Sequence, residues 1–154
     1  MTAPFVVLAC GNPSRGDDAL GPLLLARLAD WLQAEGFADR FELIEDFQFQ
    51  IEHALDLQGR RMALFIDAAE NLPSPFVLEP VPEQATPSHS THAITPAAVL
   101  EVARRTLGEA PPPSWQLLVL GSDFELGAPP GPSACAHLEL AWPALRQFCR
   151  DVMG

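Results

Sequence analysis

The stretch from residue 5 to residue 21 constrains the fold of this chain more than any other. Residues 5–9 form an uninterrupted apolar run, the pattern of a strand buried on both faces of a sheet. Gly11 and Asn12 end this run and open a loop, and apolar residues at helical spacing begin at Leu20. Two adjacent carboxylates, Asp17 and Asp18, therefore stand where the loop is expected to meet a helix.

Strands and helices are predicted to alternate along the rest of the chain. Further strands are expected at residues 41–45, 61–67, 76–82 and 115–121, and helices from Asp17 or Asp18 to Gly36, at 49–57, at 95–107 and from 133 to about 153. Prolines in the fourth strand indicate an edge position, Thr95 and Pro96 mark a helix start, and Ser133 is the expected cap of the last helix. Pro143 is expected to kink or break that helix.

This alternation predicts an α/β fold. The expected architecture is a three-layer α/β/α sandwich around a mostly parallel five-stranded sheet. With 154 residues and no internal repeat, the chain is expected to form a single domain, residues 1–154.

The charge and the cysteines exclude several classes of function. A formal net charge of −11 would repel polyanions, so nucleic acid and acidic membranes are not expected as partners. No apolar run reaches the roughly 18 residues of a membrane-spanning helix, and no secretory signal pattern opens the sequence. The three cysteines are widely spaced and form no C-x-x-C pair. A reduced, cytoplasmic protein is therefore favoured over a disulfide framework.

Polar side chains follow three of the predicted strands. Asp17 and Asp18 come after the first strand, Asp67 ends the third, and His92 lies between the fourth strand and the next helix. Ligands of open α/β sheets usually bind beyond the carboxyl ends of the strands. Carboxylates and an imidazole at such a place could hold a borderline divalent metal, or could act as acid and base on a substrate.

Each of these residues also has a purely structural interpretation. One of Asp17 and Asp18 is expected to cap the helix, which leaves one for function, and Asp18 is the choice because it is nearer the helix. Asp67 could start a turn, and His92 could be a solvated loop residue; His89, three residues earlier, adds only a weak H-x-x-H pattern.

Other catalytic motifs are absent from the sequence. The glycines after the first strand match neither a dinucleotide-binding loop nor a P-loop, and no serine-hydrolase elbow or zinc-protease motif is present. Cys10 ends a buried strand without an evident base, which favours an inert thiol over a nucleophile.

The loop resembles that of the hydrogenase maturation endopeptidases, small proteases that finish the large subunit of nickel–iron hydrogenases. Their pattern is roughly G-N-x-x-x-x-D-D/E-x-x-G, and residues 11–21 fill every defined position. Residues 65–68 (F-I-D-A) resemble the family's apolar strand that ends in aspartate. Residues 92–100 resemble its histidine followed by a Val-Leu pair on a helix. The three matches agree in order and spacing and span nearly the whole chain.

This resemblance implies a function. Family members remove a short C-terminal extension from the nickel-loaded precursor of the large subunit. Asp18, Asp67 and His92 match the family's metal-binding trio, which meets nickel carried by the substrate. The resemblance therefore implies that these three residues contact the metal. They are also the candidate catalytic set, with positioning of the substrate alone as the alternative. The resemblance also implies that the protein holds no nickel at rest.

The segment after the second predicted strand departs from part of the family. Many members have a glycine-rich turn there, whereas residues 45–50 read E-D-F-Q-F-Q. This is similar to the branch that serves cytoplasmic, NAD-coupled or bidirectional hydrogenases. Asp46 is a possible fourth polar member, with a plain turn aspartate as the alternative.

Two other functions stay open at the level of sequence. One is a non-catalytic nickel-dependent chaperone or checkpoint for the large subunit. The other is a metal-dependent hydrolase of small molecules.

Overall fold

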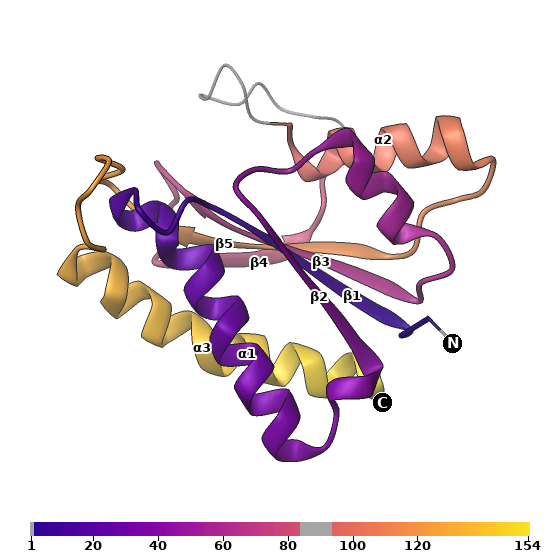
Figure 1. Cartoon of the computed structure of the whole chain (residues 1–154), viewed down its shortest axis with the longest axis horizontal. Helices are drawn as coiled ribbons and strands as arrows, with labels where there is room; N and C mark the ends of the chain where they lie inside the picture. Colours follow the sequence, from indigo (N-terminus) through magenta and orange to yellow (C-terminus); the bar gives the residue numbers. More distant parts are fainter. Residues whose placement is uncertain (1, 84–93) are drawn as a thin grey trace.

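The structure, a computed structural model, describes residues 2–83 and 94–154. Its centre is one five-stranded sheet in the order β2-β1-β3-β5-β4 (Figure 1). The strands are β1 (Phe5–Cys10), β2 (Phe41–Asp46), β3 (Met62–Ala69), β4 (Phe76–Pro80) and β5 (Ser114–Leu120). Neighbouring strands run parallel except for β4, which is an antiparallel edge strand beside β5. The prediction of a mostly parallel five-stranded sheet with residues 76–82 at its edge is confirmed.

Helices cover both faces of the sheet (Figure 1). Helices α1 (Leu20–Glu35) and α3 (Pro132–Met153) pack on one face, and the 3-10 helix η3 (Ile51–Leu57) and α2 (Pro96–Leu107) pack on the other. Because successive side chains of a strand point to opposite faces, β1 contributes Val7 and Ala9 to the first core and Val6 and Leu8 to the second. This burial on both faces explains the continuous apolar run of β1 and confirms the three-layer prediction.

Most helix ends follow their local signals. The Thr95 hydroxyl accepts a hydrogen bond from the backbone N–H of Ala98 at 3.1 Å and so caps α2. Gly36 ends α1 in the left-handed conformation, with φ of 79°.

The predicted cap of the last helix is wrong, and of the two outcomes expected at Pro143 the break does not occur. Gly131, not Ser133, is the cap residue of α3, because Pro132 already occupies the first helical position that proline favours. Pro143 does not break the helix, which runs on to Met153. Buried residues on both sides of it, Leu138 and Leu145, pack in the same core and hold the two halves on the sheet.

Within the described residues, no helix is long and apolar enough to cross a membrane.

Candidate functional site

The loop after β1 folds tightly against the start of α1, and glycines make this possible. A short 3-10 turn, η1 (Gly16–Ala19), carries the two aspartates into α1. Gly11 has φ of 148°, and a Cβ atom there would lie 1.9 Å from the carbonyl oxygen of Asp18. A Cβ atom on Gly21 would lie 2.4 Å from the carbonyl oxygen of Cys10. The first and last glycines of the G-N-to-G pattern therefore let the loop and helix approach the end of β1.

Asp18 lies half-buried at the carboxyl end of β1. Its Oδ2 atom accepts a hydrogen bond from the backbone N–H of Asn12 at 2.7 Å. Burial raises the pKa of Asp18 above its ordinary value, although the Asn12 N–H and the nearby Arg15 oppose this effect. The carboxyl keeps lone pairs that these contacts do not use, so it is able to bind a further group.

Asp17 has a different role from the one predicted for it. Neither aspartate caps a helix with its side chain. The side chain of Asp17, only 2 % exposed, instead accepts backbone N–H groups of Ser122, Asp123 and Gly131 at 2.7–3.1 Å. Burial alone would raise its pKa, but these donors outweigh burial and hold the pKa of Asp17 below its ordinary value. Asp17 thus fastens the loop after β5, residues 121–131, to the loop after β1.

Asp67 lies in the last part of β3, two residues before the strand ends. Burial raises its pKa to about 7; a hydrogen bond from the Cys10 thiol opposes this rise, and the charge of Asp18 adds to it. The structure therefore brings Asp18 and Asp67 close enough to repel each other. Two predicted site residues from separate parts of the sequence meet at one edge of the sheet.

Cys10 also belongs to this site, which the sequence analysis did not foresee. Ala9 pairs with Ile66 in the parallel register of β1 and β3, which places Cys10 beside Asp67. Burial and the nearby carboxylates raise the pKa of the Cys10 thiol, which favours the protonated form and disfavours a role as a nucleophile. The position of Cys10 at the end of the first strand was the available signal. Strand register, which sequence alone does not reveal, was needed to interpret it.

Three further residues were named from the sequence. His92 and His89 lie outside the described residues. The Asp46 carboxylate lies 3.4 Å from Nε2 of His53 and also accepts the N–H of Phe47. Asp46 thus stabilises the turn that follows β2. Among residues 2–83 and 94–154, no three His, Cys, Asp or Glu side chains are grouped so that they could hold a metal ion.

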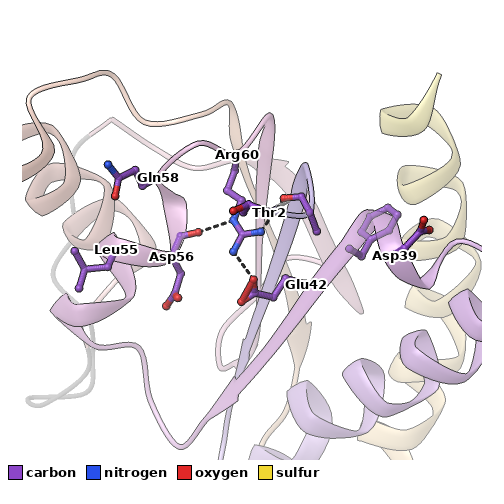
Figure 2. Close-up of a pocket in the computed structure, with 9 residues that line it drawn as sticks. Thr2, Asp39, Glu42, Leu55, Asp56, Gln58 and Arg60 are labelled. Carbon is purple, nitrogen blue, oxygen red and sulfur yellow. Dashed lines mark hydrogen bonds and ion pairs between the residues drawn. The ribbon is translucent and has the colours of Figure 1, made fainter.

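A hollow of about 880 Å³ lies at the opposite edge of the sheet (Figure 2). Residues that precede or begin β1, β2 and β3 line it, so it lies at the amino ends of these parallel strands. Arg60 crosses it and donates to Glu42 and to the carbonyl oxygens of Asp56 and Ala3. The hollow is therefore separate from Asp18 and Asp67, and none of the motif residues lines it.

Solved structures with the same fold include hydrogenase maturation proteases. One is the hydrogenase maturating endopeptidase HybD from E. coli, with a TM-score of 0.78 and 23% identity over 96% of this chain and 93% of that one. Another is the hydrogenase maturation protease HycI from Thermococcus kodakarensis KOD1, with a TM-score of 0.73 and 18% identity over the same shares of the two chains. No protein-family model matches the chain, and no curated protein matches it.

The chain has the fold of the hydrogenase maturation proteases. The match covers almost the full length of both chains.

Proposed function

We propose that this protein is an endopeptidase that removes the C-terminal extension from the large-subunit precursor of a nickel–iron hydrogenase. The proposal is supported by the fold, which solved hydrogenase maturation proteases share. It is carried by one observation within that fold. Asp18, from the G-N-to-G motif, lies beside Asp67 at the carboxyl edge of the sheet, where ligands of such sheets bind.

The proposed metal in this reaction is nickel, which arrives as part of the precursor. Asp18, Asp67 and His92 are the proposed contacts, because carboxylates and an imidazole suit a borderline divalent ion. Asp18 offers carboxylate lone pairs that its contact with Asn12 does not use. The site would thus bind the nickel-loaded precursor and not the nickel-free one, so that only the loaded form is cleaved.

The proposed substrate is the precursor of a cytoplasmic, NAD-coupled or bidirectional hydrogenase. The support is the sequence at the end of β2 and just after it, where residues 45–50 replace the glycine-rich turn of other members. A cytoplasmic location for this protein follows from that substrate.

The proposed reaction is hydrolysis of one peptide bond. The oxygen of a water molecule bonds to the scissile carbonyl carbon, and the bond from this carbon to the amide nitrogen breaks. One of the two site carboxylates takes the proton from the water and returns it to the leaving amine. Nickel held by the precursor supplies a Lewis acid that polarises the carbonyl.

Mass spectrometry of the candidate precursor tests this function directly. The precursor is mixed with the protein in nickel-loaded and nickel-free form. Loss of one discrete C-terminal peptide from the loaded form alone is the expected result. Cleavage of both forms would retain the endopeptidase and overturn the recognition of nickel. An intact precursor that binds tightly would instead support the non-catalytic checkpoint.

Matched variants assign the reaction to the site. Asp18→Asn and Asp67→Asn each keep the size of the side chain and remove its charge, and both are expected to lower the rate of cleavage by about 100-fold or more. Asp39→Asn makes the same chemical change at the opposite edge of the sheet and is expected to cleave normally. Normal binding and normal cleavage by Asp67→Asn would contradict the assignment. Turnover of a free ester or dipeptide, with no action on the precursor, would favour a small-molecule hydrolase.

A further inference from the structure

We propose that Cys10 is a positioning residue for the proposed cleavage: its thiol donates a hydrogen bond to Asp67 and holds that carboxylate in the orientation in which it meets the precursor. Cys10 itself does not contact the substrate and acts only through Asp67. The inference rests on the proposed function, because that function is what gives Asp67 a substrate to meet.

Strand pairing brings the two side chains together. Ala9 lies opposite Ile66 in the parallel register of β1 and β3, so the next residues, Cys10 and Asp67, are neighbours on strands about 4.8 Å apart. Ala9 and Ile66 both pack in the core beneath α1 and α3. Because successive side chains alternate between the faces of a sheet, Cys10 and Asp67 both point to the other face, and Cys10 packs in the core on that side.

Hydrogen bonds on both sides of the sulfur direct the thiol. Its sulfur accepts the backbone N–H of Phe49, and its S–H donates to the Asp67 carboxylate. Phe49 is itself fixed, because it is only 4 % exposed and its ring packs edge-on against that of Phe65 with 5.3 Å between the centroids. Cys10 is equally buried, so water does not compete for its S–H. The thiol therefore has a single direction in which to donate.

Asp67 is a residue that needs such a partner. The carboxyl group of an aspartate rotates over a broad range about its last torsion angle unless hydrogen bonds hold it. Asp67 is partly exposed at the end of its strand, and the Cys10 thiol and the Ala68 N–H are its donors. These two use only part of the carboxylate's roughly four lone-pair sites, which leaves others for nickel or water. Donors that orient a metal-contacting carboxylate in this way are typically worth about 10- to 100-fold in metal affinity or activity.

Cys149 provides the matched comparison. Like Cys10 it is a buried thiol, with 0 % of its surface exposed, but it lies on α3 in the apolar core beneath the sheet. Burial raises the pKa of the Cys149 thiol to about 12, and no carboxylate contributes to this rise. The two cysteines thus share their burial and differ in whether the thiol has a carboxylate to hold.

The first test asks whether donation, rather than packing, is what cleavage requires. Cys10→Ala and Cys10→Val remove the donor and are expected to lower kcat/KM for the nickel-loaded precursor about tenfold or more. Cys10→Ser keeps a donor in place and is expected to stay within about threefold of the wild type. Cys149→Ala is the control and should cleave normally at a temperature where all the proteins are folded. Wild-type cleavage by Cys10→Ala, or cleavage by Cys10→Val as fast as by Cys10→Ser, would overturn the positioning role.

Infrared spectroscopy of the free protein tests the hydrogen bond without any cleavage. An S–H group that donates absorbs at a lower wavenumber than one that does not, and each band is assigned by its loss in Cys10→Ala or Cys149→Ala. The Cys10 band is expected below the Cys149 band at a pH well above the pKa of Asp67. Asp67→Asn should raise the wavenumber of the Cys10 band, because a neutral amide is a weaker acceptor than a carboxylate. Coincident bands, or a Cys10 band that Asp67→Asn does not move, would contradict the bond.

Binding of the precursor separates failure of this inference from failure of the proposed function. Biolayer interferometry measures the affinity of the nickel-loaded precursor for the immobilised wild type, Cys10→Ala and Cys149→Ala. If the wild type binds without cutting, the endopeptidase proposal fails; binding about tenfold weaker in Cys10→Ala alone would still show that Cys10 positions Asp67 for nickel. If the wild type cuts and Cys10→Ala binds and cuts equally well, the endopeptidase stands and the positioning role is overturned.

Discussion

Asp17 and Asp18 are neighbours in sequence with opposite surroundings, and the surroundings assign their tasks. Asp17 is buried among three backbone N–H donors, which satisfy its charge within the protein. Asp18 has one such donor and remains half-buried. A carboxylate whose charge is already balanced by local donors has little left to offer a ligand. The second aspartate is therefore the one available for chemistry, whereas the first determines where its loop lies.

Replacing Asp67 with asparagine is expected to change how the stability of the free protein depends on pH. The folded pKa of Asp67, about 7, lies above its ordinary value of 3.8. Between these values the folded state binds more protons than the unfolded state, so the free energy of unfolding falls as pH rises through this window and levels off above it. Asparagine has no such proton. Asp67→Asn is therefore expected to gain about 2 kcal/mol relative to the wild type between about pH 5 and pH 8.

Urea denaturation of both proteins at the two pH values measures this difference. Asp39→Asn controls for the loss of one acidic charge elsewhere on the protein. If the wild type and Asp67→Asn lose stability equally as pH rises, burial does not hold the proton on Asp67.

At the scale of elements, local signals were sufficient for the strands and most of the helices. The apolar run of β1, the cap of α2 at Thr95 and the left-handed Gly36 each act within a few residues, so sequence alone reveals them. The junction between the loops after β1 and β5 joins residues more than 100 positions apart. No local pattern marks it. That is why Asp17 was assigned to a helix cap rather than to the loop that it holds.

Asp17→Asn is expected to lower the free energy of unfolding by about 1–3 kcal/mol near pH 7. Both carboxylate oxygens of Asp17 accept backbone N–H groups, whereas the asparagine side chain has only one oxygen that can accept. The folded pKa of Asp17 is lowered, so its stabilising effect is present above the ordinary pKa and is lost as pH falls through the folded value. Hydrogen exchange should then speed up at the backbone N–H groups of Ser122, Asp123 and Gly131. Unchanged exchange at these three positions would show that the carboxylate does not hold the loop.

Pro143→Ala is expected to stabilise the protein by about 1–3 kcal/mol, because an exposed proline inside a helix lacks the N–H that continues the hydrogen-bond ladder. Helix α3 is continuous through this position, so alanine fits the backbone that is already there. Thermal or urea unfolding measures the change, and Ala144→Gly on the same helix should shift stability in the opposite direction. A less stable Pro143→Ala protein would mean that the proline ring packs favourably.

In the whole molecule, the carboxyl and amino ends of the parallel strands, which form the two edges discussed here, have different roles. The carboxyl edge gathers Asp18, Asp67 and Cys10, and the amino edge holds the Arg60 contacts (Figure 2). Sequence analysis could foresee the first edge, because carboxyl ends of parallel strands meet there. It could not foresee that Cys10 touches Asp67, which depends on strand register, or that Arg60 joins three segments from separate parts of the chain.

Arg60→Met tests this division of the molecule. Methionine keeps much of the arginine's apolar stem but removes its donors, so the carbonyl oxygens of Ala3 and Asp56 and the Glu42 carboxylate lose their partner. The Glu42 side chain is 44 % exposed and is partly solvated, so the expected loss of stability is about 1–3 kcal/mol rather than that of a fully buried pair.

Because these contacts lie at the amino edge, kcat and KM for the precursor are expected to stay within about twofold of the wild type at a temperature where both proteins are folded. Arg61→Met, an exposed neighbour, is the control and should change neither quantity. A large fall in kcat for Arg60→Met without unfolding would mean that the two edges are coupled through the sheet, and that the site cannot be understood from its own edge alone.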